Sequence, residues 1–132
     1  MKKIIILFLL FLQSEFVFAN TQIEVIKVYD GDSILAQIED NIFRIRLIGI
    51  DCFEATDNTR AHLQAKKFNL SLNEVLKRGN IAGDILKKEL DNKKVFFEFR
   101  GIDKYKRALG YIYADNVNIN QKMLKTSYCS VY

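Results

Sequence analysis

Residues 22–54 read QIEVIKVYDGDSILAQIEDNIFRIRLIGIDCFE, and this stretch decides the fold. Apolar side chains recur in three runs, with the alternation typical of strands that bury one face. The runs cover residues 22–29, 33–39 and 42–50. Asp30-Gly31 between the first two is a strong turn signal, and polar residues 39–41 separate the last two. The stretch therefore predicts three antiparallel strands joined by tight turns.

The middle of the chain changes to a helical period. Residues 55–70 hint at a short helix, and Ser71 with Glu74 three residues later has the pattern of a helix capping box. Gly79 interrupts the helical pattern. The pattern resumes as one apolar stripe made by Ile81, Ala82, Ile85, Leu86 and Leu90. We expect this stripe to face the core.

The last third returns to strands. Residues 94–100 and 107–114 have strand patterns, and Asn118 is placed to cap a closing helix. The resulting order, β-β-β-α-β-β-α, predicts a β-rich α+β fold with a five-stranded OB-type barrel. Such barrels often bind oligonucleotides, but a fold alone does not give a function.

The first nineteen residues predict a secretory signal peptide. Lys2 and Lys3 precede an unbroken apolar run over residues 4–12, and residues 17–19 offer a signal-peptidase site after Ala19. The run is too short to span a bilayer, and an uncleaved anchor is the alternative interpretation. We therefore expect residues 20–132 to form one exported domain, periplasmic or extracellular, without stable membrane association.

Charge and composition narrow the chemistry. The chain carries 20 Lys and Arg against 16 Asp and Glu, a formal charge of +4, which permits a polyanionic partner without requiring one. His62 is the only histidine, which excludes a two-histidine ribonuclease mechanism and a His-rich zinc site. Cys52 and Cys129 are the only cysteines; in an exported protein they pair as a disulfide or remain two free thiols.

Three acids and an arginine cluster around the third predicted strand. Asp32 follows the first turn, and Asp51 and Glu54 lie at the strand end. Together they offer the oxygen ligands that Ca²⁺ prefers, although each alone is more often a solvated cap. Arg46 lies inside an apolar run, where an arginine needs a partner. Strict alternation puts Arg46 and Asp51 on opposite faces, so they converge only if the strand coils or bulges near Gly49.

A second basic cluster lies between the last two predicted strands. Residues 103–107 read DKYKR. In the plain interpretation this is only a charged turn. In the functional interpretation Arg107 is a second phosphate-binding fork opposite Arg46, and Lys104 and Tyr105 donate to another phosphate.

Four segments in order resemble the staphylococcal nuclease (thermonuclease) family. They are DGDS at residues 30–33, RLIGIDCFE at 46–54, DKYKR at 103–107 and NINQKML at 118–124. The resemblance extends over nearly all of residues 20–132. It implies an OB-fold, Ca²⁺-dependent nuclease that cleaves DNA and RNA, single-stranded or frayed, with little sequence preference, and leaves a 3′-phosphate. We expect a monomer.

The resemblance also assigns roles to residues of this chain. The implied calcium ligands are Asp32, Asp51 and the backbone carbonyl of Cys52. The implied catalytic set is Arg46, Glu54 and Arg107. Lys104 and Tyr105 resemble the pair that binds a terminal phosphate.

The chain departs from the family pattern at several positions. Cys52 and Phe53 stand where the family often has Thr-Pro, so the loop that carries Glu54 is less restricted in φ. Lys106 replaces the usual glycine, and residues 55–78 are longer than the corresponding loop of compact members. Beyond residue 132 the family prototype continues into a helix and base-stacking tyrosines, for which Tyr128 or Tyr132 are the candidates here.

Two rival functions stay open. One is a nucleic-acid-binding OB module that is catalytically weak or inactive; the complete set of Arg46, Glu54 and Arg107 argues against it, because a binder need not keep all three. The other is a structural exported domain whose acids only bind Ca²⁺. Salt-sensitive oligonucleotide binding distinguishes the second rival from a nuclease.

Overall fold

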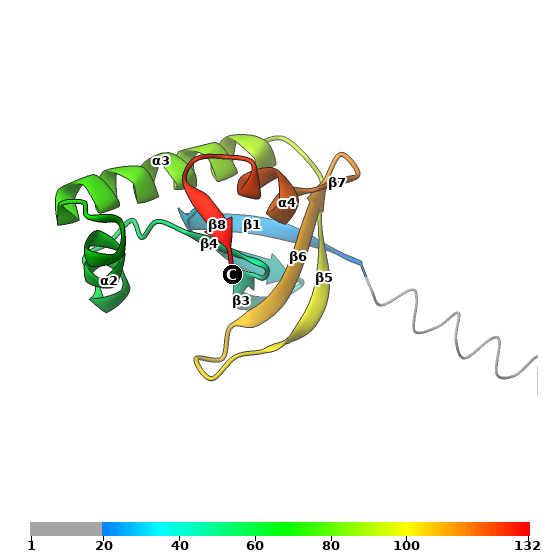
Figure 1. The fold of residues 1–132 in the computed structure, drawn as a ribbon. Coiled ribbons are helices and arrows are strands. Elements are labelled where there is room, and N and C mark those ends of the chain that lie inside the picture. Colours follow the sequence, from blue (N-terminus) through cyan, green and yellow to red (C-terminus); the bar gives the residue numbers. More distant parts are fainter. Residues whose placement is uncertain (1–19) are drawn as a thin grey trace, which may run out of the picture.

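The computed structural model describes residues 20–132, so the predicted signal peptide lies outside the described part of the chain. The strands are β1 (Thr21–Asp30), β2 (Ser33–Ile38), β3 (Asn41–Leu47), β4 (Ile50–Cys52), β5 (Val95–Ile102), β6 (Ala108–Ala114), β7 (Val117–Asn118) and β8 (Cys129–Val131). The helices are α2 (Thr59–Phe68), α3 (Leu72–Leu90) and α4 (Ile119–Leu124). None of these helices is long and apolar enough to cross a membrane. Figure 1 shows the strands curling around one core, with α3 lying across them.

Five strands close into a barrel, which confirms the predicted OB-type fold. The strand order is β3-β2-β1-β5-β6-β7, and β3 also pairs in parallel with β6, with Ile45 opposite Ala108 and Leu47 opposite Gly110. That parallel pairing joins the two ends of the sheet, while β7 only extends β6. The most buried core side chains include Ile34, Ile45, Leu47, Leu86, Ile112, Ile119 and Met123.

The prediction of one strand over residues 42–50 is wrong. β3 ends at Leu47, a turn follows, and β4 begins at Ile50 and pairs instead with β8. Gly49 has φ of 81°, a left-handed conformation that glycine adopts without strain. Asn120, buried in α4, fixes the turn: its amide nitrogen donates to the carbonyl of Ile48 at 3.0 Å and to that of Gly110 at 3.1 Å. The turn sets the direction in which β4 leaves the barrel.

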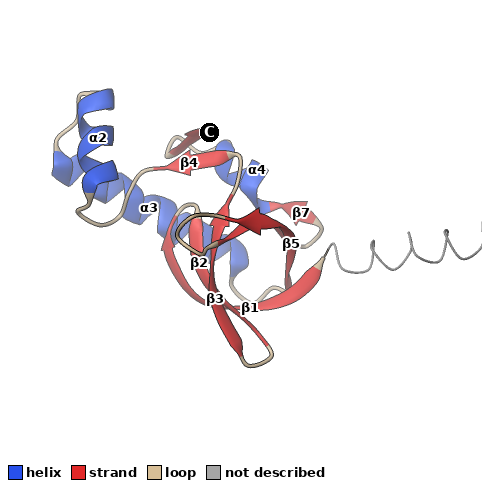
Figure 2. Cartoon of the chain, turned by 90° about the horizontal axis from the view of Figure 1, so that it is seen from below, coloured by secondary structure: helices blue, strands red, loops and turns tan. Residues whose placement is uncertain are grey.

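The helices begin where the caps predict, but the predicted interruption at Gly79 is wrong. The hydroxyl of Ser71 accepts from the backbone nitrogen of Glu74 at the start of α3, which then runs unbroken through Gly79. A Cβ at Gly79 would overlap the carbonyl oxygen of Glu54, so glycine here allows close approach of the loop to the helix. Figure 2 shows α2 beside the N-terminal end of α3, away from the barrel.

Candidate active site

Asp32 lies in a buried turn beside a second acid. Its side chain is 7% exposed, and its Oδ2 accepts from the backbone nitrogen of Cys52 at 2.7 Å. Its own backbone nitrogen donates to Oδ1 of Asp30, also buried. Burial raises the pKa of Asp32 well above its ordinary value, the neighbouring Asp30 carboxylate raises it further, and Arg46 opposes the shift. The turn therefore holds two buried acids side by side, where a bound cation would stabilise their charged forms.

The turn at Gly49 brings Arg46 to both acids. The Nη1 atom of Arg46 lies 3.4 Å from Oδ2 of Asp32, and its Nη2 atom lies 3.7 Å from Oδ1 of Asp51. The guanidinium also donates to the carbonyls of Leu47 and Ile50, at 2.6 and 3.0 Å. Because the chain turns at residues 48–49 after β3, Arg46 and Asp51 converge without a continuous bulged strand. Four acceptors thus hold one largely buried guanidinium in a fixed orientation.

Arg60, in the first turn of α2, bridges the carboxylates of Asp51 and Glu54. Its Nη2 atom donates to Oδ1 of Asp51 at 2.7 Å, and its Nε atom donates to Oε1 of Glu54 at 3.3 Å. Asn58 donates to the second oxygen of Glu54 at 3.1 Å. Although partial burial disfavours its charge, the two carboxylates raise the pKa of Arg60. Arg60 is half exposed, so its contacts can exchange with a ligand.

Gln64 fixes the loop between β4 and α2 from one turn further along the same helix. Its side-chain oxygen accepts from the backbone nitrogen of Glu54 at 2.9 Å, and its amide donates to the carbonyl of Cys52 at 3.0 Å. Phe53, between them, is buried and packs on the ring of Phe68 at 5.2 Å between ring centroids. This clamp restricts the loop at the position where the family often has proline.

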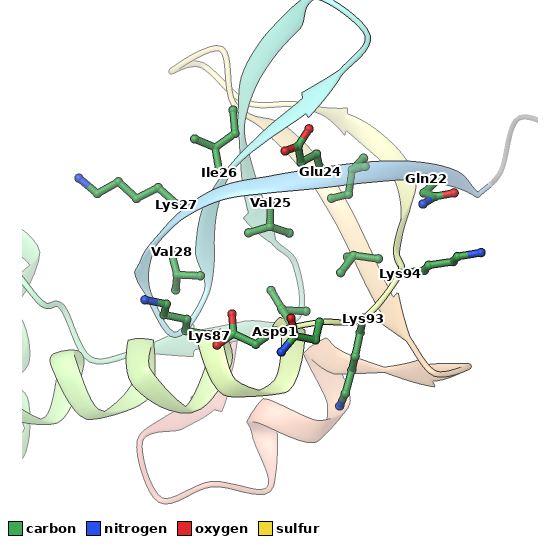
Figure 3. A pocket seen from close by; sticks show the side chains of 14 residues that line it. Gln22, Glu24, Val25, Ile26, Lys27, Val28, Lys87, Asp91, Lys93 and Lys94 are labelled. Atoms are coloured by element: carbon green, nitrogen blue, oxygen red, sulfur yellow. The ribbon is translucent and has the colours of Figure 1, made fainter.

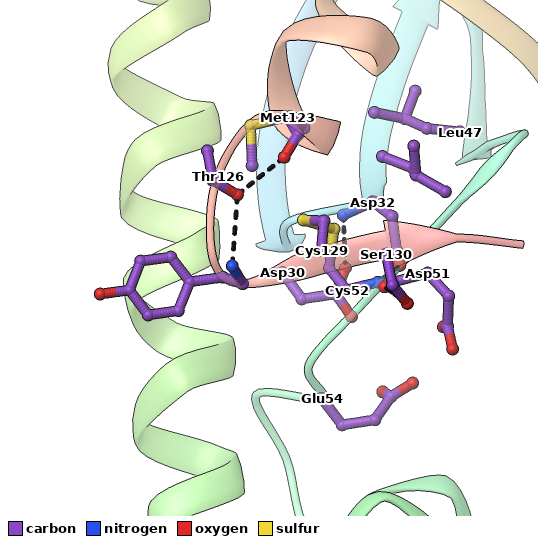
Figure 4. The surroundings of a disulfide bond; sticks show 12 residues. Asp30, Asp32, Leu47, Asp51, Cys52, Glu54, Met123, Thr126, Cys129 and Ser130 are labelled. Atoms are coloured by element: carbon purple, nitrogen blue, oxygen red, sulfur yellow. Dashed lines mark hydrogen bonds between the residues drawn. A yellow bond between two sulfur atoms is a disulfide. The ribbon is translucent and has the colours of Figure 1, made fainter. Parts of the chain in front are cut away.

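Cys52 and Cys129 lie opposite each other in the β4–β8 pair, and their sulfur atoms are joined 2.01 Å apart. Figure 4 shows the disulfide beside the acids, with the carboxylates of Asp51 and Glu54 extending towards the same region. The hydroxyl of Ser130 in β8 also donates to the carbonyl of Asp51, at 3.4 Å. β8 therefore supports the strand that carries Asp51.

The basic turn 103–107 is organised by its own acid. Asp103 accepts from the backbone nitrogens of Tyr105 and Arg107, both at 2.9 Å, and from Nε of Arg107 at 2.8 Å. Lys106 has φ of 63°, the left-handed conformation for which the family's usual glycine is suited. Arg107 thus keeps its outer guanidinium nitrogens free of Asp103 for a phosphate.

A hollow of ≈ 400 Å³ brings the predicted phosphate-binding residues together. It is lined by Arg46, Arg60, Lys104, Tyr105, Arg107 and Tyr132, together with Asp103 and apolar residues of β3 and β6. The Tyr132 ring lies 5.9 Å from the guanidinium carbon of Arg46. Cationic side chains beside tyrosine rings are suited to bind a nucleotide, because the cations can bind its phosphate while a ring stacks on its base.

A larger groove, of ≈ 650 Å³, lies elsewhere, between β1 and α3. Figure 3 shows Lys87, Lys93 and Lys94 along it, but Glu24 and Asp91 also line it. Lys93 lies within 4 Å of Glu89 and Asp115, which offset its charge. Since the groove contains none of the predicted site residues, size alone does not locate the chemistry.

The oxygens present fit a hard cation such as Ca²⁺. The carboxylates of Asp32 and Asp51 and the carbonyl of Cys52 are all oxygen donors of the type that Ca²⁺ and Mg²⁺ prefer. Burial is the main cause of the raised pKa of Asp32, and a cation bound beside this carboxyl group would stabilise its charged form. Each of these oxygens already has a partner within the protein: Arg46 pairs with Asp32, Arg60 pairs with Asp51, and Gln64 donates to the carbonyl of Cys52. Within residues 20–132 no cluster of three His, Cys, Asp or Glu side chains has the arrangement of a preformed metal cage.

Sequence reasoning missed Arg60 and Gln64. They are four residues apart on α2, so their side chains lie on one face of the helix. The sequence offered one signal: Gln64 follows Ala61 by three residues, so the two lie on the same face of the helix. In the structure both are buried, whereas His62 and Leu63 between them are exposed. His62 lies 2.7 Å from the exposed Asp57 and does not line the hollow that contains Arg46 and Arg107.

A five-stranded OB barrel that carries an arginine- and carboxylate-lined hollow defines a class of small proteins suited to phosphodiester ligands. The profile of the family described as Staphylococcal nuclease homologue matches residues 44–132. The chain belongs to this family.

Individual relatives agree with that assignment. The chain is 32% identical over 120 residues to an uncharacterized protein of Methanocaldococcus jannaschii, covering 83% of the chain and 58% of that protein. It is 31% identical over 111 residues to a thermonuclease of Staphylococcus hyicus, covering 81% and 57%. It is 29% identical over 133 residues to an uncharacterized endonuclease of Escherichia coli, covering 100% and 74%. The chain spans less than two thirds of the length of the first two relatives.

Proposed function

We propose that this protein is an exported, calcium-dependent nuclease that hydrolyses phosphodiester bonds of DNA and RNA with little sequence preference. Support comes chiefly from one observation: Arg46, Lys104, Tyr105 and Arg107 line one hollow, and Arg60 links that hollow to Glu54 and Asp51. The family assignment and the thermonuclease and endonuclease relatives point the same way. Weak base preference follows because the lining offers phosphate-binding groups and stacking rings.

In the proposed reaction, water attacks the phosphorus and the bond from phosphorus to the 5′-oxygen breaks. One product keeps a 3′-phosphate, and the other leaves with a 5′-oxygen that takes a proton from solvent. Glu54 orients that water and accepts its proton, with its orientation set by Asn58 and Gln64. Arg46 and Arg107 neutralise the charge that develops on the phosphoryl oxygens. Lys104 and Tyr105 hold a terminal phosphate of the substrate. Losing one arginine side chain should raise the activation barrier by several kcal/mol. Because about 1.4 kcal/mol of barrier corresponds to a tenfold change, the rate should fall by orders of magnitude.

Asp32, Asp51 and the carbonyl of Cys52 would hold Ca²⁺. The ion supplies Lewis-acid polarisation of a non-bridging phosphate oxygen when it is bound. Residues 1–19 direct export, to a periplasm or beyond the cell, and the remaining domain acts as a monomer. The formal charge is +4 for the whole sequence and +3 without Lys2, Lys3 and Glu15 of the signal peptide, and this positive charge favours encounter with the polyanionic substrate.

The test is digestion of single-stranded DNA and RNA by residues 20–132, with Ca²⁺ or with chelator. Glu54→Ala and Arg46→Ala serve as site variants, and His62→Ala, on an exposed position of α2, is the matched control. We expect Ca²⁺-dependent cleavage that only the site variants abolish, with 3′-phosphate ends on the products. Intact nucleic acid in every reaction, from protein shown to be folded, would instead favour the inactive binding module.

A further inference from the structure

A second hollow of ≈ 510 Å³ adjoins the first. Its walls include Tyr29 of β1, Arg44 of β3, and Asn58 and Thr59 at the start of α2. Arg60, Tyr105 and Arg107 line both hollows, so the two meet beside Arg107, which is proposed to bind the scissile phosphate. A polynucleotide strand continues on both sides of the bond that is cut. The second hollow therefore lies where the strand would continue.

The lining of this second hollow suits a nucleotide. The guanidinium carbon of Arg44 lies 4.2 Å from the centre of the Tyr29 ring, and Lys27 lies 5.0 Å from the same ring. A flat arginine stacked on a tyrosine gives a surface on which an unpaired base can stack whatever its identity. Arg44 is exposed, and Arg60 is half exposed, so both are available to phosphates.

The two acids of this hollow do not cancel its positive charge. Asp30 is buried and accepts the backbone nitrogen of Asp32. Glu54 is held by Arg60 and Asn58. Arg44 forms no ion pair with an acid among the described residues, so its charge faces the hollow uncompensated.

We propose that this hollow is a second nucleotide subsite, which binds the nucleotide across the scissile phosphate from the first hollow. The base stacks on the Tyr29–Arg44 pair, and Arg60 binds the phosphate where the two hollows meet. The subsite requires a single-stranded or unpaired substrate, because a stacked and paired base cannot reach the ring. Its role as a substrate subsite rests on the proposed nuclease function.

Equilibrium binding tests the subsite without depending on turnover. In a Glu54→Gln background with Ca²⁺, fluorescence anisotropy measures the affinity for labelled octathymidylate, and calorimetry measures the affinity for thymidine 5′-monophosphate, which fills only one subsite. Tyr29→Ala should weaken octamer binding roughly tenfold, the usual effect of losing one stacking ring. Arg44→Ala should weaken it several-fold, Tyr29→Phe should retain it, and monophosphate binding should change in none of these variants.

Arg100→Ala is the matched control, since Arg100 lies 5.7 Å from the Tyr111 ring in the same type of pair but lines neither hollow. The proposal is overturned if Arg44→Ala and Tyr29→Ala bind the octamer as Arg100→Ala does, if monophosphate and octamer affinities fall together, or if the parent binds no octamer at low salt. Failure of the nuclease proposal gives a different result. The protein with Glu54 intact then fails to cleave, while the ranking of octamer affinities among the variants persists. Thermal unfolding of each variant verifies that it is folded.

Discussion

The side-chain oxygen of Gln64 lies 2.9 Å from the backbone nitrogen of Glu54, which attaches helix α2 to the proposed catalytic glutamate. The amide of the same side chain donates to the carbonyl of Cys52, two residues earlier. One buried glutamine thus sets the spacing between a proposed metal ligand and the proposed base. The longer segment over residues 55–78 supplies the constraint that Phe53, unlike proline, does not.

Replacing Gln64 with Leu should impair both stability and turnover. The change leaves the nitrogen of Glu54 and the carbonyl of Cys52 without their partners, which costs about 1–3 kcal/mol of unfolding free energy. We expect kcat to fall more than KM rises, because Glu54 loses its orientation while the phosphate-binding arginines remain. Urea unfolding and steady-state kinetics measure the two effects. An unchanged kcat in Gln64→Leu would show that α2 does not position Glu54.

Lys106→Gly should stabilise the protein. Lys106 adopts φ of 63°, which costs a residue with a Cβ about 1–2 kcal/mol. Glycine removes that strain but loses more entropy on folding, so we expect a net gain of about 0.5–1 kcal/mol. Lys106→Ala removes the same charge and keeps the strain, so it should not share the gain. Equal thermal unfolding midpoints for the two variants would contradict the explanation.

Asp103 should contribute stability that depends on pH. Although its limited burial acts to raise the pKa of Asp103, hydrogen bonds from Arg107 and Tyr105 lower it below its ordinary value. A lowered folded-state pKa gives stability that is present above the unfolded value, about 3.9, and is lost as the pH falls through the folded value. Asp103→Asn should therefore be less stable than the parent near neutral pH, and the gap should close in stronger acid. Urea unfolding across this range measures it; a gap independent of pH would contradict the assignment.

Arg60→Ala should increase the affinity for Ca²⁺ in the absence of substrate. The guanidinium of Arg60 occupies Oδ1 of Asp51, so a cation must compete with it. We expect a gain of about two- to fivefold, the size of an exposed ion pair. Arg78→Ala, which removes a comparable exposed pair with Glu74, should leave the affinity unchanged. Calorimetric titration with calcium chloride decides; a loss of affinity would mean that Arg60 orients Asp51 for the metal.

The disulfide should carry much of the stability of the β4–β8 pair. Cys52 and Cys129 are 77 positions apart, and a crosslink that closes so long a loop contributes roughly 3–5 kcal/mol. Cys129→Ser should lose most of that. Intact-mass measurement tests the bond itself, since the oxidised protein must be lighter than the reduced one by two hydrogen atoms. Equal masses would show two free thiols.

The barrel could be predicted because its strands follow a simple period. Ile34 and Ala36 are completely buried where alternation places them, whereas in β6 the buried face carries Ile112 and not the predicted Leu109, Tyr111 and Tyr113. Local caps were equally readable at Ser71 and Asn118. By contrast, β7 and β8 are only two and three residues long, so no period can reveal them.

The site was harder to predict because its geometry depends on distant contacts. Arg46 and Asp51 meet because Asn120 fixes the turn at Ile48 from 72 positions away. The break between β3 and β4 is therefore a tertiary effect that hydrophobic alternation cannot reveal. Gly79 was misjudged for a related reason: it serves the packing of α3 against the Glu54 loop, not the end of a helix.

The disulfide also links oxidation to ion binding. It ties down β4, whose Asp51 and Cys52 are two of the three proposed calcium ligands. Coupling between two equilibria is reciprocal: if the crosslink increases calcium affinity by some factor, bound calcium must favour the oxidised form by the same factor. A calcium-rich, oxidising medium would then stabilise the oxidised, calcium-bound form through both equilibria. A reducing, calcium-poor cell interior would destabilise that form through both.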